Sequence, residues 1–228
     1  MNKSAILAAT MFGALAAFGG VSVLSVAPAA AQSATVKAPA GVYKLDATHA
    51  ALLWSVKHFN ISNYTGRFSK IDATLTIDPA NIEAASIEVT IDPRSVQTSY
   101  PADYKAFHAK SNYANWDEDV SRNPNFLNSD NFPAITFKST KVEKTGDKTA
   151  KVTGDLTFLG VTKPVTLETT LNGELEKHPF LGVPALGFAA EGHFKRSDFG
   201  QKFAGPLGDD VTIRFDGEFL QQVKPAAQ

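Results

Sequence analysis

The sequence predicts an all-β protein, and within that class it favours an eight-stranded antiparallel barrel. Segments in which apolar and polar side chains alternate recur along the chain, as expected for strands with one buried face. Short turns link nearly all of these segments, which implies antiparallel neighbours. A sandwich and a closed barrel both fit this pattern, and closure favours the barrel because it leaves no edge strands.

The N-terminal segment, residues 1–31, has the features of a signal peptide. Lys3 supplies a positive charge, an apolar stretch follows over residues 5–26, and Ala29-Ala30-Ala31 has the small-x-small form of a cleavage site. We therefore expect cleavage after Ala31. An uncleaved membrane anchor is the alternative, because the apolar stretch approaches the length of a membrane span.

The rest of the chain is predicted to form one domain over residues 42–222, a common size for a single all-β domain. Residues 32–41 are rich in Ala, Pro and Ser and are expected to form a flexible leader. Residues 223–228 are expected to form a disordered tail.

Composition limits the classes of function. The formal net charge is −1, which indicates no nucleic-acid partner. The chain has no cysteine, so an exported form has to be stable without disulfides. Its 16 phenylalanines supply apolar surface for a packed core or a lined cavity.

The first half of the predicted barrel begins at Tyr43. A strand over 52–59 places Leu52, Trp54, Val56 and His58 on its inner face, because Ser55 and Lys57 mark the outer one. We expect a polar connection over 60–67 and then strands over 71–77 and 86–91, each ended by an Asp-Pro pair.

A long loop over residues 94–133 separates the third main strand from the fourth. Tyr100, Tyr104 and Phe107 lie at helical spacing, so we expect a short amphipathic helix over 102–114. Loops of this length are usually functional lids or partly disordered, and the aromatic residues favour a packed cap. The acidic residues 117–119 are interpreted as a solvated loop.

The second half is centred on a hairpin over residues 152–167 with one apolar face. Strands are also expected around 135–137, 186–195 and 211–219, with a hairpin turn at 145–148 and an exposed loop around 178–182. The inner positions of these strands are Phe137, Leu156, Phe158, Val165, Leu167, Phe188, Phe194 and Phe215.

Residues that could carry chemistry are few. No two of the five histidines have a metal-ligand spacing, and no nucleophile elbow, HExxH or phosphate-binding loop is present. We therefore predict no catalytic residue, no metal site and no cofactor. His58 points inward, either to meet a ligand or as a satisfied core histidine. Arg196 could bind a phosphate or carboxylate, or form a strand-end ion pair that orders the next loop.

Several blocks of the sequence resemble, in order, the signatures of the YceI-like, polyisoprenoid-binding family. They are Asp46-x-x-His49, Val56-Lys57-His58, Gly66-Arg67-Phe68, Asn131-Phe132-Pro133-Ala134-Ile135-Thr136-Phe137, Gly154-Asp155-Leu156-Thr157, Gly160-Val161-Thr162-Lys163-Pro164-Val165 and Arg196-Ser197-Asp198-Phe199-Gly200. The resemblance covers residues 43–219. The chain departs from the family in the loop before Phe132, where residues 94–115 are expanded and the usual compact turn reads Asp117-Glu118-Asp119-Val120.

The resemblance implies a lipocalin-like barrel, exported to the periplasm, that carries or sequesters a long amphiphile. The implied ligand is an isoprenoid quinone, a polyprenyl compound or a fatty-acid derivative. Transient contact with a membrane and a homodimer are further expectations. Two alternatives stay open: an enzyme acting on a small lipid-like substrate, and a stress or interaction protein with a closed barrel that docks through Phe180 and Leu181.

The expected ligand-binding residues fall into three groups. Tyr104 and Phe107 are expected to cover the mouth of the barrel, and His58 and Arg196 to make polar contacts. For the aromatic residues, ordinary core packing is the alternative. The residues expected to line the barrel are Trp54, Val56, Phe137, Phe158, Phe188, Phe194 and Phe215.

Overall fold

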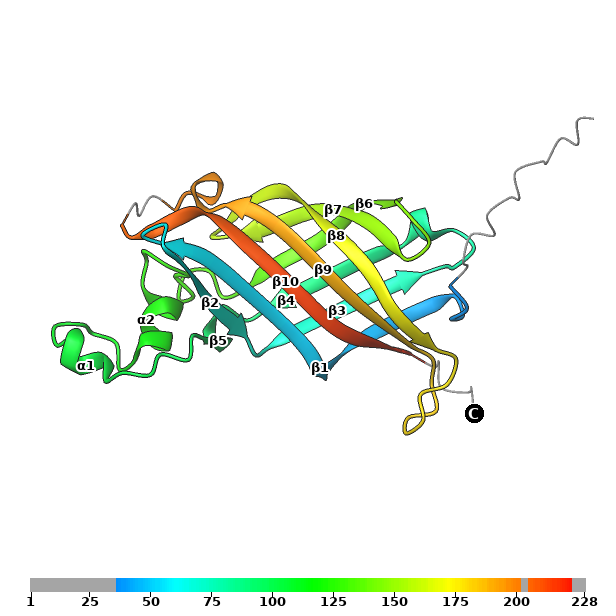
Figure 1. The fold of residues 1–228 in the computed structure, drawn as a ribbon, viewed down its shortest axis with the longest axis horizontal. Helices are drawn as coiled ribbons and strands as arrows, with labels where there is room; N and C mark the ends of the chain where they lie inside the picture. The colour runs from blue at the N-terminus through cyan, green and yellow to red at the C-terminus, as the bar shows by residue number, and fades with distance from the viewer. Residues whose placement is uncertain (1–35, 202–204, 223–228) are drawn as a thin grey trace, which may run out of the picture. The chain divides into compact units, whose positions relative to one another are not determined.

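The computed structural model describes residues 36–201 and 205–222. The predicted signal peptide and C-terminal tail lie outside these ranges. Ten strands form one antiparallel sheet (Figure 1). They are β1 (Gly41–His58), β2 (Ser62–Phe68), β3 (Ile71–Ile77), β4 (Ser86–Ile91), β5 (Val96–Gln97), β6 (Ile135–Lys144), β7 (Thr149–Phe158), β8 (Val161–Leu175), β9 (Ala185–Lys195) and β10 (Leu207–Gln221).

The sheet closes into a barrel because β1 pairs with β10 along its length. On its other side, β1 pairs with β3 through Gly41–Lys44 and with β2 through Leu52–His58. The strands β2 and β3 therefore together fill one strand position beside β1. The strands β5 and β4, which pair with β2 and β3 respectively, together fill the next position. The predicted eight-stranded antiparallel barrel is confirmed, with two of its eight positions each filled by a broken strand.

Two predictions for the first strands are wrong. The structure has one continuous strand over Gly41–His58, and the expected polar connection over 60–67 contains β2. The sequence pattern misses β2 because Gly66 occupies an inward-facing position, between Tyr64 and Phe68, where an apolar side chain would have continued the alternation of a strand. A Cβ built on Gly66 would lie 2.3 Å from Cζ2 of Trp54, so the Trp54 ring occupies the space of the missing side chain.

The central hairpin has the predicted form. Strands β7 and β8 pair from Phe158↔Val161 to Thr149↔Thr170. Leu159 and Gly160 form the turn with positive φ values of 50° and 75°. The predicted inner positions Leu156, Phe158 and Val165 are buried.

The long loop between β4 and β6 contains two short helices, α1 (Tyr104–Phe107) and α2 (Trp116–Arg122). The prediction of one helix over 102–114 is therefore wrong. Asp103 caps α1 by accepting from the N–H of Lys105, and Asn115 caps α2 by accepting from the N–H of Glu118. Each cap starts a new helix. Short 3₁₀ turns occur at Ile82–Ala84, Pro93–Ser95 and Arg196–Phe199.

At the end of the barrel opposite the one that carries α1 and α2 in Figure 1, a cluster of buried side chains closes the interior. Tyr43 and Leu186 are almost completely buried there, and Ala38 packs against them. The N–H groups of Lys37 and Ala38 donate to Glu174 Oε2 at 2.6 and 2.9 Å. The expected flexible leader over 32–41 therefore differs from the structure at residues 36–41, where the chain is docked and β1 has begun.

Candidate functional site

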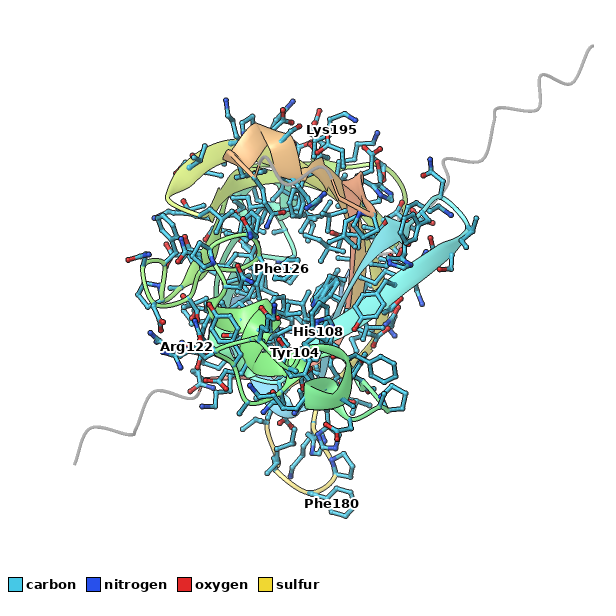
Figure 2. The ribbon with its side chains drawn as sticks, turned by 90° about the vertical axis from the view of Figure 1, so that its left-hand side faces the viewer. Tyr104, His108, Arg122, Phe126, Phe180 and Lys195 are labelled. Atoms are coloured by element: carbon cyan, nitrogen blue, oxygen red, sulfur yellow. The ribbon has the colours of Figure 1, made fainter. Side chains whose placement is uncertain are left out.

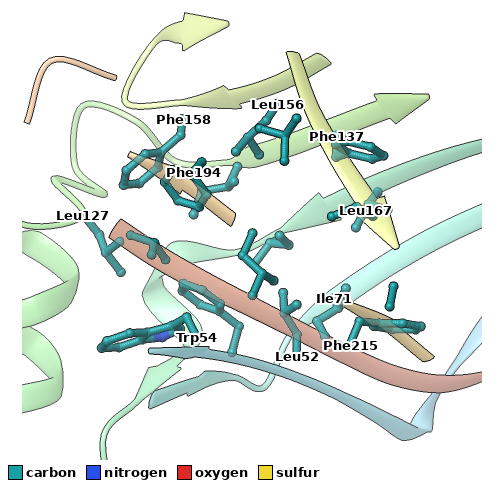
Figure 3. A pocket seen from close by; sticks show the side chains of 18 of the residues that line it. Leu52, Trp54, Ile71, Leu127, Phe137, Leu156, Phe158, Leu167, Phe194 and Phe215 are labelled. Carbon is teal, nitrogen blue, oxygen red and sulfur yellow. The ribbon is translucent and has the colours of Figure 1, made fainter. Parts of the chain in front are cut away.

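The barrel encloses a cavity of about 790 Å³. Its wall is made of inward-facing side chains from every strand of the barrel except the two-residue β5, and Figure 3 shows aromatic and aliphatic residues on opposite sides of the space. The following predicted ligand-binding residues line it: Trp54, Val56, His58, Phe137, Phe158, Phe188, Phe194, Arg196 and Phe215. Their contact with a ligand stays a prediction.

An aromatic cluster forms part of the wall. The ring centroid of Phe158 lies 5.9 Å from that of Phe194 and 5.7 Å from that of Phe199, with edge-to-face geometry. Phe199 is buried behind the wall in the 3₁₀ turn that follows β9. The cluster holds these rings in place and so defines the width of this part of the cavity.

The cavity opens between the loops at the end that carries α1 and α2. Its rim includes Tyr100, His108 and Trp116 from the long loop and Pro206 from the segment before β10. The His108 ring stacks on Tyr104 and Trp116, with centroids 4.7 and 5.8 Å apart. Figure 2 looks at the barrel from this end and labels Phe126 and His108 at the rim, with Tyr104 beside His108 in the long loop.

Hydrogen bonds fix the long loop against the barrel. The indole N–H of Trp116 donates to the Tyr64 hydroxyl of β2 at 2.7 Å, and Thr98 donates through N–H and Oγ1 to Asp117. These contacts explain why a loop of this length has a defined shape.

The acidic residues at the start of α2 belong to this loop scaffold. Asp119 is buried and accepts hydrogen bonds from the hydroxyl of Tyr104 and from Asn123 Nδ2, 2.7 Å away. Burial, together with the bond to Asp119, raises the pKa of Tyr104. Interpreting residues 117–119 as a solvated acidic loop is therefore wrong, because these carboxylates accept hydrogen bonds inside the long loop.

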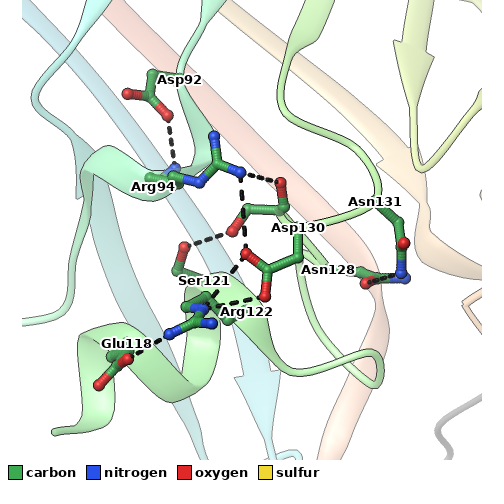
Figure 4. A network of polar contacts seen from close by, with 9 residues as sticks. Asp92, Arg94, Glu118, Ser121, Arg122, Asn128, Asp130 and Asn131 are labelled. Carbon is green, nitrogen blue, oxygen red and sulfur yellow. Dashed lines mark hydrogen bonds and ion pairs between the residues drawn. The ribbon is translucent and has the colours of Figure 1, made fainter. Parts of the chain in front are cut away.

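A charged network ties the C-terminal half of the same loop together (Figure 4). Arg122 contacts Glu118 Oε1 at 2.7 Å and Asp130 Oδ2 at 3.0 Å, while Arg94 donates to the carbonyl of Ser129 at 3.0 Å. The hydroxyls of Ser121 and Ser129 lie 2.9 Å apart in the buried centre. The network links the end of β4 to α2 and to the start of β6.

Arg196 lines the cavity near the mouth, and several protein groups accept hydrogen bonds from it. Its guanidinium donates to the carbonyls of Gly208 and Leu207 at 2.8 and 3.0 Å and to Gln201 Oε1 at 2.9 Å. Burial lowers its pKa. These bonds hold the start of β10 and the residues before it. Because the guanidinium is already bound by protein carbonyl groups, the structure favours a role for Arg196 in ordering this loop over a role in binding a ligand anion.

Two predicted site residues lie elsewhere. Tyr104 is buried inside the long loop and does not line the barrel cavity, because its hydroxyl is held by Asp119. Phe107 projects outward from α1 and is 72% exposed. The prediction that these two side chains cover the mouth is wrong in this structure. His108 and Trp116, which line the rim of the cavity, were not predicted as ligand-binding residues. The only sequence signal for them is that they are aromatic residues of the same long loop as Tyr104 and Phe107.

The cavity wall carries few ionisable groups. Within residues 36–201 and 205–222 these are His58, His108, Asp119 and Arg196, and the lining also includes the polar groups of Trp54, Tyr64, Tyr100 and Trp116. In the same ranges no three His, Asp or Glu side chains gather as metal ligands would. No helix in the described part of the chain is both long enough and apolar enough to cross a membrane.

Comparison with known proteins agrees with this architecture. The chain is 39% identical to the protein YceI of Shigella flexneri over 188 residues, covering 81% of this chain and 90% of that one. The crystal structure of a Campylobacter jejuni YCEI protein matches with a TM-score of 0.58 and 29% identity, covering 73% and 90% of the two chains. A polyisoprenoid-binding domain of Saccharophagus degradans, implicated in plant cell wall breakdown, shares the fold at 15% identity with a TM-score of 0.50, covering 79% and 98%.

The family model for the YceI-like domain matches residues 43–219, which is nearly the whole barrel from the start of β1 to the end of β10. The signature blocks found in the sequence lie within this range. The chain therefore belongs to the YceI-like family.

Proposed function

We propose that the protein binds an isoprenoid or similar long-chain amphiphilic lipid inside its barrel and acts as a periplasmic carrier or sequestering protein. The observation that carries this proposal is the cavity, which is apolar along the strands, blind at one end and open at the other. Isoprenoid quinones, polyprenyl compounds and fatty-acid derivatives all have the long apolar tail that such a space accepts. The Saccharophagus degradans domain that shares the fold is a polyisoprenoid-binding domain.

The tail supplies most of the binding free energy. Burial of one methylene contributes ~0.8 kcal/mol, so each five-carbon isoprene unit contributes about 3 kcal/mol or more before ordering costs. The cavity volume lies within the range of about 300–1,000 Å³ that is usual for ligand pockets. The polar rim residues, such as Asn123, Asn125 and Gln201, support placement of the head group at the mouth.

Periplasmic location is part of the proposal. It is supported by the signal-peptide features of residues 1–31 and by a family resemblance that implies export. A long apolar tail is poorly soluble in water, so a carrier between membranes would need to enclose it.

Two other classes of function have less support. An interaction protein needs a filled barrel, whereas this barrel has an open apolar cavity. An enzyme needs polar groups that converge on one point. In the described part of the cavity wall, Asp119 and Arg196 are already bound by protein groups, which favours binding over catalysis.

Mass spectrometry of lipids extracted from the purified mature protein tests the proposal. We expect an amphiphile with a long apolar tail. An Ala190→Phe variant is the matched control, because Ala190 lines the cavity and a ring at this position fills part of it. This variant should retain less lipid. Recovery of no amphiphile, together with failure to take up an added isoprenoid quinone, would contradict the proposal.

A further inference from the structure

Three large apolar side chains are exposed at the open end of the barrel. Phe59 and Ile61 stand in the turn between β1 and β2, with 65% and 85% of their surface exposed, and Phe107 stands on α1 with 72% exposed. Isolated exposed apolar residues are ordinary, but a group around one opening indicates an interaction site.

The three residues are tied to the rim of the cavity through the chain itself. Phe59 directly follows His58, and Phe107 directly precedes His108; both histidines line the cavity. The backbone N–H of Phe59 also donates to the carbonyl of Pro206, another rim residue, at 2.7 Å. The exposed apolar residues therefore flank the route by which a ligand reaches the interior.

The backbone at Phe59 is unusual for a bulky residue. Phe59 and Asn60, in the three-residue turn 59–61, have φ values of 49° and 58°, a left-handed conformation that Asn or Gly adopts at low cost. A phenylalanine here costs conformational energy and buries little surface in return. Such a cost at an exposed site is a reason to look for a partner outside the molecule.

Three basic residues lie beside these side chains, and the exposed acid Asp103 caps α1. Lys57 precedes the turn, and Lys105 and Lys110 belong to or follow α1; all three are exposed. None of them forms an ion pair with an acid in the described part of the chain. The nearby acids Asp117, Glu118 and Asp119 already accept hydrogen bonds inside the long loop.

We propose that the open end of the barrel docks on an anionic lipid bilayer, with Phe59, Ile61 and Phe107 inserted among the lipids and the three lysines at the headgroups. The inference rests on the proposed function, because a ligand with a long apolar tail resides in a membrane before it is bound. Docking places the cavity mouth at the bilayer surface, so the tail passes from lipid to barrel without crossing water.

A bilayer fits this surface better than a protein does. Three side chains on two separate loops around an opening do not form the contiguous patch that a stable protein interface needs, which is usually above about 1,000 Å² in total. A fluid surface accepts separate apolar tips without shape complementarity, and basic residues beside them add attraction to anionic lipids.

The sealed end supplies a matched control. Phe180 and Leu181 are also exposed, but they lie in the loop between β8 and β9, and Figure 2 shows Phe180 projecting away from His108 and Tyr104. Their replacement removes two exposed apolar side chains at a place that the proposal leaves out of contact with the bilayer.

Sedimentation with vesicles of phosphatidylglycerol and phosphatidylethanolamine tests the proposal on the mature protein. We expect Phe59→Ser/Ile61→Ser/Phe107→Ser to weaken vesicle binding by about tenfold or more, since the variant loses three apolar side chains that insert among the lipids. The Phe180→Ser/Leu181→Ser control should bind like the unaltered protein. Ile61→Asp alone should weaken binding as well, which keeps the test valid if the triple variant is poorly folded.

A second measurement distinguishes failure of the docking proposal from failure of the proposed lipid-binding function. Uptake of a short-tailed, water-soluble quinone should be the same in all variants, because none of the replaced residues lines the cavity. No vesicle binding by the unaltered protein, or equal loss in the triple variant and the control, would overturn the docking surface. A homodimer that the triple variant alone converts to a monomer, without vesicle binding, would assign the surface to a second copy of the chain. Failure of the unaltered protein to take up the quinone would instead count against the proposed function.

Discussion

Phe158 connects the stability of the barrel to the size of its cavity. It is buried in the wall, and its ring packs against those of Phe194 and Phe199. A larger ring at this position has to project into the cavity, because the other side is occupied by these aromatic neighbours.

We predict that Phe158→Trp weakens the binding of long-tailed lipids while the barrel still folds, with overpacking costing about 1–3 kcal/mol of unfolding free energy. Titration with prenyl quinones of increasing tail length, alongside urea unfolding, measures both effects. Phe180→Trp adds the same ring at an exposed site and should change neither. Unchanged affinity for every tail length would remove Phe158 from the ligand wall.

A second residue-scale feature lies on the outer surface, where Asp46 and His49 interact within β1. Asp46 Oδ2 lies 2.8 Å from His49 Nδ1, and Thr48 donates to the other carboxylate oxygen. Hydrogen bonds from Thr48 and His49 lower the pKa of Asp46 to about 2. The hydrogen bond to Asp46 raises the pKa of His49.

We predict that Asp46→Asn returns the pKa of His49 toward its ordinary value near 6.5. In the unaltered protein, the stabilisation from protonated His49 is present at pH below that value and is lost as the pH rises through the raised pKa. The contribution of Asp46 is present above its ordinary pKa of 3.8 and is lost as the pH falls toward about 2. Titration of the histidine ring by NMR measures the shift, with the other four histidines as internal reference. An identical His49 titration in both proteins would contradict the pairing.

At the scale of elements, one buried polar contact joins the two short helices of the long loop between β4 and β6. Tyr104 of α1 donates to Asp119 of α2, and Asn123 supplies a second hydrogen bond to that carboxylate. The two helices have only four and seven residues, so their order comes from such tertiary contacts and not from helix propensity.

We predict that Tyr104→Phe loosens the loop and leaves the barrel intact. Removal of the hydroxyl deprives a buried carboxylate of one partner, which costs about 1–3 kcal/mol locally. Amide hydrogen exchange should become faster in α2 and stay unchanged in β9 and β10. Tyr113→Phe is the control, because the Tyr113 hydroxyl makes no hydrogen bond with other described residues. Equal exchange in α2 of both variants would contradict this role for Tyr104.

The elements differ in how well the sequence predicts them. Strands β7 and β8 were predicted because apolar and polar residues alternate over most of each strand, so that the single gap at Gly154 does not hide the pattern. The continuous β1 and the strand β2 were not, because polar residues such as Asp46 and Thr48 interrupt the first and Gly66 leaves a gap in the inner face of the second. Helix boundaries in the long loop depend on the caps Asp103 and Asn115, which periodicity does not detect.

In the candidate site, too, the sequence predicted some residues correctly and misplaced others. Residues that face inward on strands were placed correctly, because strand alternation fixes which side of the sheet a side chain takes. Tyr104 and Phe107 were misplaced because their directions depend on how the loop packs. The hydrogen bonds of Arg196 to Gly208 and Leu207 were not foreseen either, since they depend on the pairing of β9 with β10 and on the course of the segment that joins them.

At the scale of the whole molecule, closure depends on the last strand. β10 pairs with β9 on one side and with β1 on the other, so its removal exposes two sheet edges and opens the cavity wall at Val211, Ile213 and Phe215. Unpaired edges of this length promote aggregation.

We predict that a chain ending at Gln201 does not unfold cooperatively and aggregates, whereas removal of residues 223–228 alone leaves stability unchanged. Urea unfolding followed by circular dichroism, with size-exclusion chromatography, distinguishes the two. A soluble monomer with a single cooperative transition from the shorter chain would show that the barrel does not need β10.

The cluster around Tyr43 and Leu186 has a consequence for exchange kinetics. Because the cavity is closed at one end, a lipid has to enter tail first through the mouth and leave by the same route. The head group is then the last part to arrive and the first part that an acceptor can meet. Each added isoprene unit lengthens the path that has to be withdrawn, so residence time should rise with tail length while the arrival rate changes little.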